Sequence, residues 1–330
     1  MQLGLIGGGS WATAIAKIIT ENNNSLFWYL RNSNTVNHIQ QRKHNPHYLS
    51  NISFDTSLLQ LGYSLQEVVE KSDTIIIAVP AAFIEETLKP LPANVFEGKT
   101  IISAVKGIIP HNNLLLNDHL KEQFHVALEN YYTLLGPCHS EEVASEKLSY
   151  LTFSGLDVTT TKKLADYFKT NYTNVVINTD VIGVQYAAVL KNIYAIGAGI
   201  AHGLDYGDNF LSVYSANAAE EMKTFLNKIS KCTSNINCNA SVYLGDLLVT
   251  CYSLHSRNRT LGAMIGKGYS VKAAQLEMNM VAEGYNASKC INEINKTVQA
   301  HIPIAKTIYE ILWEQAAAEE SFKKIEDILI

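Results

Sequence analysis

The sequence predicts an α/β protein in which a doubly wound parallel sheet is followed by an all-helical C-terminal domain. Three observations support this fold class. The strand pattern of Gln2–Ile6 passes directly into a glycine turn and a helical segment. Short β patterns then alternate with helical ones up to about residue 180, which is typical of a parallel sheet covered by helices. Beyond that point only helical periods remain. The 330 residues suffice for two domains, and we place them at 1–180 and 181–330.

The predicted strands of the first domain are short runs of apolar residues. Thr74–Val79 is continuously apolar and ends at a proline, as expected for a strand buried on both faces. Helices are predicted over Ser10–Thr20 and over Leu65–Lys71, the latter preceded by a capping box that starts at Ser64. The predicted strands are Gln2–Ile6, Ser25–Leu30, Thr74–Val79, Thr100–Ala104, Thr133–Leu135, Tyr150–Ser154 and Asn174–Ile177.

The second domain is predicted to be helical throughout. Val181–Leu204 has the pattern of a long apolar helix, and a further helix is expected over Gly245–Arg259. Phe225–Ala240 is polar and irregular, so we expect a loop or a short solvated helix there. Val271–Met280 and Pro303–Gln315 have amphipathic periods and are predicted as the helices that close the chain.

Composition and charge exclude several classes of function. The chain is 47% hydrophobic and 17% charged, as in ordinary soluble globular proteins. Its net charge is −5 and it has no basic stripe, so we expect no nucleic-acid partner. No uninterrupted apolar run reaches the roughly 18–20 residues of a membrane span. The five cysteines show no C-x-x-C or zinc spacing and no export signal is present, so we expect no metal site and a cytoplasmic location.

Gly7-Gly8-Gly9 is the first candidate binding element. With Ala12 it forms a G-x-G-x-x-A motif that follows a strand and opens a helix. Glycines let the backbone approach a pyrophosphate, and the helix N-terminus supplies N–H donors and a positive dipole. A simple tight turn would also contain such glycines. The position of the motif favours a Rossmann-type dinucleotide site.

Arg31 follows the second predicted strand, where NAD-binding chains usually place an acidic residue. A guanidinium there tolerates a 2′-phosphate and can also stack on adenine. An exposed surface arginine is the alternative. We therefore expect NADP or NAD as coenzyme, with NADPH used at least as well as NADH.

Lys191 and Asn192 lie within the apolar helix predicted over Val181–Leu204. An unpaired buried ammonium is strongly disfavoured, and a buried lysine can exchange protons near neutral pH. A lysine that extends its amine to the surface is the alternative. Apolar residues at the positions four before and four after Lys191 argue against that alternative.

The helix predicted over Gly245–Arg259 places Asp246, Thr250 and Arg257 within a sector of roughly 40°. Its leucines, Leu254 among them, are expected to pack the helix into its surroundings. An internal ion pair between Asp246 and Arg257 would explain the two charges. The run Ser256-Arg257-Asn258 favours a phosphate or carboxylate ligand instead, because guanidinium, hydroxyl and amide groups together suit such a guest.

Further candidates follow two of the later strands. Lys106 comes after Thr100–Ala104, and Gly136 to Ser140 follow Thr133–Leu135, at the carboxyl ends where a doubly wound sheet binds its ligands. Cys138 could be a reactive thiol, but no base partner is evident. Glu283, in a break near the end of the chain, is by itself a surface carboxylate.

Taken together, these residues resemble the bacterial-type NAD(P)-dependent glycerol-3-phosphate dehydrogenases over nearly the whole chain. The resemblance rests on ordered elements that include Gly7-Gly8-Gly9-Ser10-Trp11, Lys106-Gly107, Leu190-Lys191-Asn192, Ser256-Arg257-Asn258 and Glu283-Gly284. It implies a Rossmann domain followed by a helical domain. It also implies an enzyme that interconverts sn-glycerol 3-phosphate and dihydroxyacetone phosphate and thereby supplies phospholipid synthesis. The sequence leaves the oligomeric state open, and a homodimer is compatible with it.

Motifs and resemblance together define the expected sites. For catalysis the resemblance implies Lys191 as proton acceptor with Asp246 close to it, and we add Lys106 and Asn192. The expected coenzyme-binding residues are Gly7, Gly9, Ser10, Trp11, Arg31, Lys106, Ser140, Arg257, Val281 and Glu283. The expected substrate-binding residues are Lys106, Gly136, Cys138, Lys191, Asp246, Thr250, Ser256, Arg257 and Asn258.

The sequence departs from the family pattern at several positions. Cys138 stands where the family usually has serine or threonine, and Ser140 where it usually has alanine. Residues 215–218 replace the family's usual Thr-Arg-Gly stretch. Two rival functions stay open: a dehydrogenase of the same build that acts on a 3-hydroxy acid or sugar acid, and a non-catalytic NAD(P)-binding sensor. Ser256-Arg257-Asn258 argues against the first, and Lys191 with Asp246 argues against the second.

Overall fold

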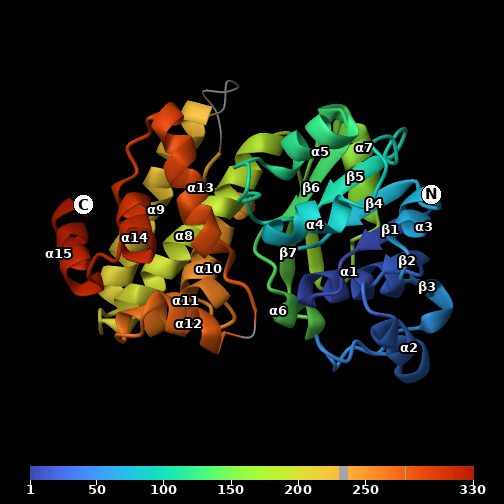
Figure 1. The fold of residues 1–330 in the computed structure, drawn as a ribbon, viewed down its shortest axis with the longest axis horizontal. Coiled ribbons are helices and arrows are strands. Elements are labelled where there is room, and N and C mark those ends of the chain that lie inside the picture. Colours follow the sequence, from blue (N-terminus) through green and yellow to red (C-terminus); the bar gives the residue numbers. More distant parts are fainter. Residues whose placement is uncertain (230–236, 279) are drawn as a thin grey trace. The chain divides into compact units, whose positions relative to one another are not determined.

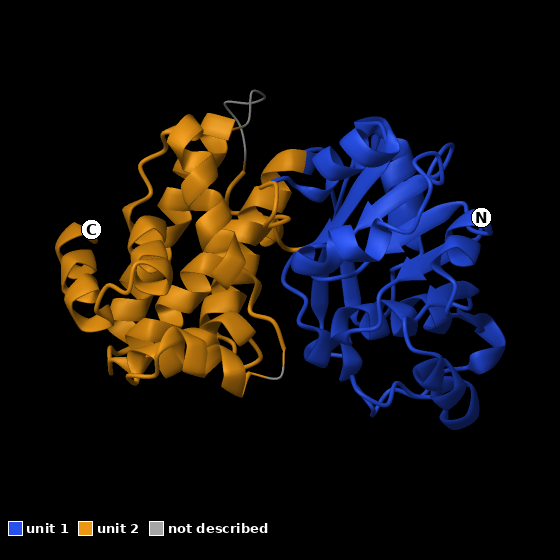
Figure 2. Ribbon diagram, viewed as in Figure 1, with its two compact units in different colours: residues 1–105, 114–181 blue, residues 106–113, 182–330 orange. Residues whose placement is uncertain are grey.

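The computed structural model describes residues 1–229, 237–278 and 280–330. The chain folds into two compact units, which Figure 2 distinguishes by colour. The first unit comprises residues 1–105 and 114–181, and the second comprises residues 106–113 and 182–330. The segment 106–113 thus belongs to the second unit although its neighbours in the sequence belong to the first. A single boundary near residue 180 does not describe this division, because it leaves Lys106 in the first domain.

The first unit contains an eight-stranded sheet in the order β3-β2-β1-β4-β5-β6-β7-β8 (Figure 1). Every neighbouring pair is parallel except β6 and β7, which are antiparallel. The strands are β1 Leu3–Ile6, β2 Leu26–Tyr29, β3 Leu59–Gly62, β4 Thr74–Ile77, β5 Thr100–Ser103, β6 Tyr131–Leu135, β7 Ser149–Ser154 and β8 Thr173–Asn178.

The sheet is parallel as predicted, and the pair of β6 and β7 is its one exception. Between β6 and β7 the structure has one helix, α6, which spans only Ser140–Ala144. A helix of five residues rises roughly 7–8 Å, less than the length of a strand of similar residue number. It therefore does not carry the chain back along the sheet, and β7 runs in the direction opposite to β6.

Helices α1 to α7 lie in the connections between the strands of the sheet. They are α1 Ser10–Glu21, α2 Ser33–Arg42, α3 Leu65–Glu70, α4 Ile84–Leu88, α5 Leu116–Phe124, α6 Ser140–Ala144 and α7 Val158–Asp166. The central strands β1 and β4 are buried along their whole length, which explains why their apolar runs are continuous. The edge strand β3 is only partly buried and has mixed residues, so its pattern gave no strand prediction.

The described part of the second unit is helical (Figure 1). Its helices are α8 Val181–Gly203, α9 Asp208–Ile229, α10 Asp246–Tyr252, α11 Arg257–Gly266, α12 Val271–Glu277, α13 Glu283–Val298, α14 Pro303–Trp313 and α15 Ala318–Ile328. A π-helical turn over Ser241–Gly245 leads into α10. α8 is the one helix of the described residues that is long and apolar enough to cross a membrane, and 89% of its most apolar window is buried inside the protein.

Helices α8 and α11 cross at backbone contact. A Cβ atom added at Gly262 would lie 1.9 Å from the carbonyl oxygen of Ile196, and one at Gly199 would lie 2.0 Å from the carbonyl oxygen of Arg259. Only glycine fits at both positions, since real Cβ atoms do not approach other atoms so closely. The crossing fixes the helix that carries Lys191 against the helix that begins at Arg257.

Several expectations for the second domain are wrong. Gly245–Arg259 forms two helices separated by residues 253–256, not one, and Leu254 is 83% exposed instead of packed. Phe225 to Ile229 form the end of α9, while residues 230–236 of the expected loop lie outside the described residues. The helix expected over Val271–Met280 ends at Glu277, and residue 279 is likewise outside the described residues. α15 follows the last predicted helix.

Candidate functional site

The glycine turn after β1 is held by three side chains that bind its carbonyl groups. The indole Nε1 of Trp28 donates to the Gly7 carbonyl at 2.6 Å, and Nδ2 of Asn45 donates to the Gly8 carbonyl at 3.1 Å. The hydroxyl of Thr13 donates to the Gly9 carbonyl at 2.9 Å. Sequence reasoning missed the holding roles of Trp28, Thr13 and Asn45. Because the N–H and C=O of a peptide unit point in opposite directions, a turn held by its carbonyls directs its amides the other way.

The turn has the shape that a dinucleotide pyrophosphate requires. Gly7 has φ +129° and a Cβ there would lie 2.3 Å from the Ala78 carbonyl oxygen, so only glycine fits. A Cβ at Gly9 would meet nothing within 4 Å, which shows open space at the N-terminus of α1. The first amides of a helix have no intrahelical partner. These residues therefore fit a dinucleotide coenzyme, with Ser10 buried and Trp11 partly buried in the first turn of α1.

Arg31 lies just after β2, as predicted, and is exposed. Asn32 is the N-cap of α2, where its Oδ1 accepts a hydrogen bond from the Asn34 amide at 2.8 Å. Arg31 thus lies between the carboxyl end of a sheet strand and the beginning of a helix. No acidic residue occupies the position where a carboxylate would repel a 2′-phosphate.

Gly136, Cys138 and Ser140 lie at the carboxyl end of β6. Gly136 has φ +114°, and a Cβ there would lie 2.8 Å from the Tyr150 carbonyl oxygen. The Cys138 thiol is buried and donates to the Gly136 carbonyl at 3.1 Å. The Ser140 hydroxyl donates to the Glu141 carboxylate at 3.0 Å. The cysteine therefore closes the turn internally, as a small hydroxyl side chain could also do.

In the second unit, Lys191 of α8 forms a buried ion pair with Asp246 of α10. Lys191 Nζ lies 2.5 Å from Asp246 Oδ1 and 3.1 Å from the Thr250 hydroxyl oxygen. The side chains of Lys191 and Asp246 are 5% and 2% exposed. The structure thus contradicts both the ion pair of Asp246 with Arg257 and the placement of Arg257 on the same helix. Asp246 and Thr250 do share one face of α10, as the helical period predicted.

The second carboxylate oxygen of Asp246 is buried and has no hydrogen-bond partner among the residues that the structure describes. Such an atom is costly unless water or a ligand satisfies it. The Thr250 hydroxyl donates to the Asp246 backbone carbonyl, so that the hydroxyl oxygen faces the lysine as an acceptor. Carboxylate and hydroxyl together stabilise the ammonium form of Lys191.

Asn192, Asn258 and Lys106 extend this cluster. Asn192 Nδ2 donates to the backbone carbonyl of Lys106 at 3.0 Å, and Asn258 Nδ2 donates to Asn192 Oδ1 at 3.0 Å. Asn258 Oδ1 accepts a hydrogen bond from the Gly284 amide at 2.9 Å. The structure thus brings six predicted residues into one region: Lys106, Lys191, Asn192, Asp246, Thr250 and Asn258.

Ser256 and Arg257 form the beginning of α11. The Ser256 hydroxyl oxygen accepts a hydrogen bond from the Arg259 amide at 3.2 Å, so this serine is the helix N-cap. Arg257 is the first residue of the helix and is half-buried. A guanidinium at a helix N-terminus combines charge with backbone donors, which suits an anionic group.

Val281 and Glu283 lie where α13 begins. Val281 is 37% exposed, Ala282 is the N-cap, and Glu283 is the first residue of the helix. The segment is therefore a helix start rather than a break within a helical stretch. A cluster of three or more metal-ligating side chains is absent among the described residues.

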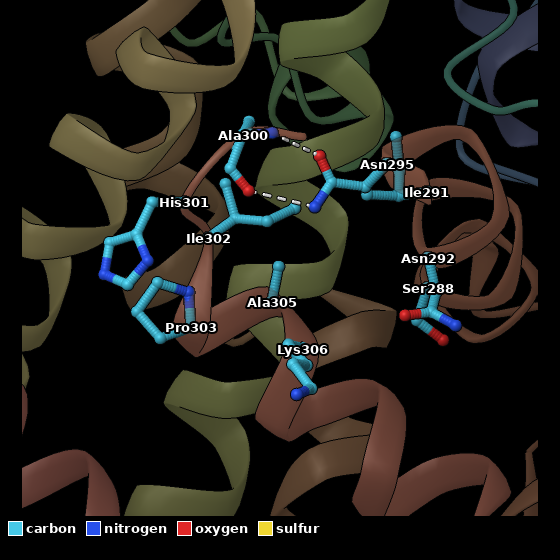
Figure 3. Close-up of a pocket in the computed structure, with 10 residues that line it drawn as sticks. All are labelled: Ser288, Ile291, Asn292, Asn295, Ala300, His301, Ile302, Pro303, Ala305 and Lys306. Atoms are coloured by element: carbon cyan, nitrogen blue, oxygen red, sulfur yellow. Dashed lines mark hydrogen bonds between the residues drawn. The ribbon is translucent and has the colours of Figure 1, made fainter. Parts of the chain in front are cut away.

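A separate cavity of about 280 Å³ lies between α13 and α14 (Figure 3). Asn295 spans its edge, since its carboxamide accepts from the Ala300 amide at 2.9 Å and donates to the Ala300 carbonyl at 3.0 Å. The lining contains none of the predicted site residues. It comprises Ser288, Ile291, Asn292, Asn295, Ala300, His301, Ile302, Pro303, Ala305 and Lys306.

Comparisons with known proteins agree with this arrangement. Residues 2–160 match the family model described as NAD-dependent glycerol-3-phosphate dehydrogenase N-terminus, and residues 180–323 match the one described as its C-terminus. Glycerol-3-phosphate dehydrogenase [NAD(P)+] of Chlorobium chlorochromatii is 31% identical over 322 residues, which cover 97% of this chain and 96% of that protein.

A second relative and a solved structure extend the comparison. The enzyme of the same name from Listeria monocytogenes is 33% identical over 326 residues, covering 97% of this chain and 94% of that protein. The crystal structure of glycerol-3-phosphate dehydrogenase from Coxiella burnetii shares the fold with a TM-score of 0.89 at 24% identity, and 98% of each chain is covered. The chain therefore belongs to the NAD-dependent glycerol-3-phosphate dehydrogenase family and is an oxidoreductase that uses NAD or NADP.

Proposed function

We propose that this protein interconverts sn-glycerol 3-phosphate and dihydroxyacetone phosphate with NAD(P) by hydride transfer at C2. Family membership supports the reaction. The observation that carries the chemistry is the buried Lys191–Asp246 pair with its unsatisfied carboxylate oxygen. When bound, the nicotinamide ring supplies or accepts the hydride. The chain's own residues must then bind the phosphate and move one proton at the C2 oxygen.

In the reductive direction Lys191 acts as the acid. Its ammonium, held by Asp246 and Thr250, polarises the C2 carbonyl and delivers a proton to the oxygen that becomes the hydroxyl. In the oxidative direction the same amine takes the hydroxyl proton back. The ion pair favours the charged form of Lys191, which is the form that can donate a proton when the substrate ketone is reduced.

Arg257 and Asn258 are proposed to bind the substrate phosphate. Arg257 opens α11 and supplies a forked cation, while the Asn258 carboxamide retains one N–H for a ligand oxygen. Lys106 and Ser256 would complete the polar surroundings. Gly7, Gly9, Ser10, Trp11 and Arg31 are proposed to hold the coenzyme at the N-terminus of α1 and after β2.

The physiological direction is proposed to be reduction, which supplies glycerol 3-phosphate for phospholipid synthesis. A cytoplasmic location agrees with the described cysteines, Cys138, Cys238, Cys251 and Cys290, which carry thiols rather than disulfides. We keep a homodimer as a proposal for the assembly.

The decisive experiment is NADPH oxidation by the purified protein with dihydroxyacetone phosphate as substrate. We expect turnover that depends on both compounds. A panel of 3-hydroxy acids and sugar acids with NADP tests the rival dehydrogenase function. Coenzyme binding without turnover of any of these compounds would favour the sensor function and contradict the proposal.

A further inference from the structure

The carboxamides of Asn192 and Asn258 form a continuous hydrogen-bonded chain between four segments of the second unit. The chain runs from the Gly284 amide through Asn258 and Asn192 to the carbonyl of Lys106, with distances of 2.9, 3.0 and 3.0 Å. It links the start of α13 to α11, to α8 and to the 106–113 segment. Asn192 and Asn258 are only 5% and 7% exposed.

The two ends of this chain fix the orientation of both carboxamides. A backbone amide can only donate, so Asn258 must turn its oxygen toward Gly284 and its nitrogen toward Asn192. A backbone carbonyl can only accept, so Asn192 must turn its nitrogen toward Lys106 and its oxygen toward Asn258. Each requirement is compatible with the other. Neither side chain can flip without opposing donor to donor or acceptor to acceptor.

Close backbone packing reinforces the same contact. A Cβ added at Gly284 would lie 2.5 Å from the carbonyl oxygen of Asn192 and 2.8 Å from its carbonyl carbon. The N-terminal turn of α13 therefore rests directly on the backbone of α8, one residue from Lys191. Asn192 thus meets α13 twice, through its own backbone and through the Asn258 side chain.

We propose that Asn192 and Asn258 are positioning residues that set the proposed coenzyme-binding segment 281–284 in register with the proposed substrate-binding residues Lys106, Lys191 and Arg257. The proposal rests on the proposed function for the roles of these residues. Asn258 uses one N–H and its carbonyl oxygen within the protein and has one N–H left for a ligand. Through this hydrogen-bonded chain, order in the 281–284 segment stabilises the position of the proposed phosphate-binding residues Arg257 and Asn258, and the reverse also holds. Binding of the coenzyme and binding of the substrate are therefore coupled.

The first test compares Asn258→Ala with the wild-type protein by hydrogen exchange and by NADPH titration. In the variant the Gly284 amide loses its acceptor, so exchange should accelerate in the peptide that contains residues 282–286. The dissociation constant of NADPH alone should rise about tenfold, in keeping with one lost buried hydrogen bond. Asn217→Ala is the matched control, because this half-buried asparagine of α9 makes its hydrogen bonds to Val213 and Ile330. It should change neither quantity.

Asn258→Asp separates positioning from general damage. Its carboxylate still accepts the Gly284 amide but opposes the Asn192 oxygen, so the start of α13 should stay protected while the link to α8 is lost. In the double variant Asn258→Ala with Gly284→Ala, the loss of NADPH binding free energy should be smaller than the sum of the losses in the two single variants. Both substitutions release the same contact between α13 and its neighbours.

Two results would overturn the proposal. One is an Asn258→Ala variant that raises the KM for dihydroxyacetone phosphate while exchange at 282–286 and NADPH affinity stay at wild-type values. The other is full additivity in the double variant. A wild-type protein that does not turn over dihydroxyacetone phosphate would instead contradict the proposed function, and the hydrogen-exchange comparison would still decide whether the asparagine chain positions α13.

Discussion

The ammonium of Lys191 and the carboxylate of Asp246 lie 2.5 Å apart in a region from which water is almost excluded. Removing one partner of such a pair is more damaging than its net contribution to stability, because the other charge stays buried without compensation. Variants at these two residues can therefore distinguish an effect on catalysis from an effect on folding.

Lys191→Ala should bind NADPH nearly as well as the wild type and lose on the order of 10²–10⁴ in kcat. The double variant Lys191→Ala with Asp246→Asn removes the stranded carboxylate as well and serves as the folding control. Steady-state kinetics and coenzyme titration of the three proteins decide the matter. If either variant keeps most of the wild-type turnover, Lys191 is not the proton donor.

Arg257 should contribute to kcat/KM for the phosphorylated substrate and little for the unphosphorylated one. Unphosphorylated dihydroxyacetone should be a very poor substrate, and Arg257→Ala should cost roughly 2–5 kcal/mol in kcat/KM for the phosphorylated one. The variant should discriminate far less between the two ketones. Equal kcat/KM values for both ketones with the wild-type enzyme would exclude a phosphate grip.

Arg31 tests coenzyme choice. NADPH should be used at least as well as NADH, because the end of β2 carries a guanidinium and no carboxylate. Arg31→Ala should weaken NADPH more than NADH by about 1–3 kcal/mol, the cost of a lost charge-assisted contact. Dissociation constants for both coenzymes measure this difference. An equal loss for the two would identify Arg31 as a residue that stacks on adenine.

At this scale the sequence predicted the residue types better than their partners. Lys191, Asp246 and Thr250 were each singled out because polar groups in apolar helices need a reason. The resemblance implied that Asp246 lies close to Lys191. The helical period did not give this contact, since it treated Gly245–Arg259 as one helix and left an ion pair of Asp246 with Arg257 as an alternative. The break at residues 253–256 decides the pairing, and no local signal as strong as a proline marks it.

At the scale of elements, the sequence pattern predicted the strands correctly where they are completely buried. The strands β1, β4 and β5 were predicted to within about two residues, because strands buried on both faces are continuously apolar. The partly exposed β3 and the amphipathic α15 were not predicted. The direction of β7 could not be read from pattern at all, because it depends on the length of the connection through α6.

The crossing of α8 with α11 is the element contact most sensitive to a single methyl group. Gly262→Ala would place a carbon 1.9 Å from the Ile196 carbonyl oxygen, so the helices must separate. We expect a loss of about 1–3 kcal/mol in the free energy of unfolding, measured by urea denaturation. We also expect a lower kcat, because Lys191 and Arg257 belong to these two helices. Gly207→Ala, which meets nothing within 4 Å, is the control and should be nearly neutral.

At the scale of the whole molecule, the helical unit contains a carboxyl group in its core. Glu221 of α9 is 7% exposed and accepts hydrogen bonds from the backbone amides of Ile304 and Ala305, the first turn of α14. The Tyr194 hydroxyl of α8 donates to it at 3.2 Å. One side chain thus joins three helices. Burial raises the pKa of Glu221 to about 7, and the amide and hydroxyl donors oppose this rise only in part.

This pKa makes stability depend on pH in a definite direction. The unfolded carboxyl titrates near 4.5, so the folded state holds the proton more tightly between pH 4.5 and 7. The stabilisation from this group is complete below pH 4.5 and is lost as the pH rises through 7. The difference between the two pKa values corresponds to on the order of 3 kcal/mol.

Glu221→Gln should remove that dependence, because the amide resembles the protonated acid and does not titrate. Urea unfolding of the wild type and the variant from pH 4.5 to 7.5 should give curves that diverge as the pH rises, with the variant relatively more stable at the upper end. The neighbouring Glu220→Gln is the matched control, since Glu220 is 66% exposed and pairs with Lys223 on the surface. Parallel pH curves for the wild type and Glu221→Gln would show that the buried carboxyl titrates no differently in the folded protein than in the unfolded chain.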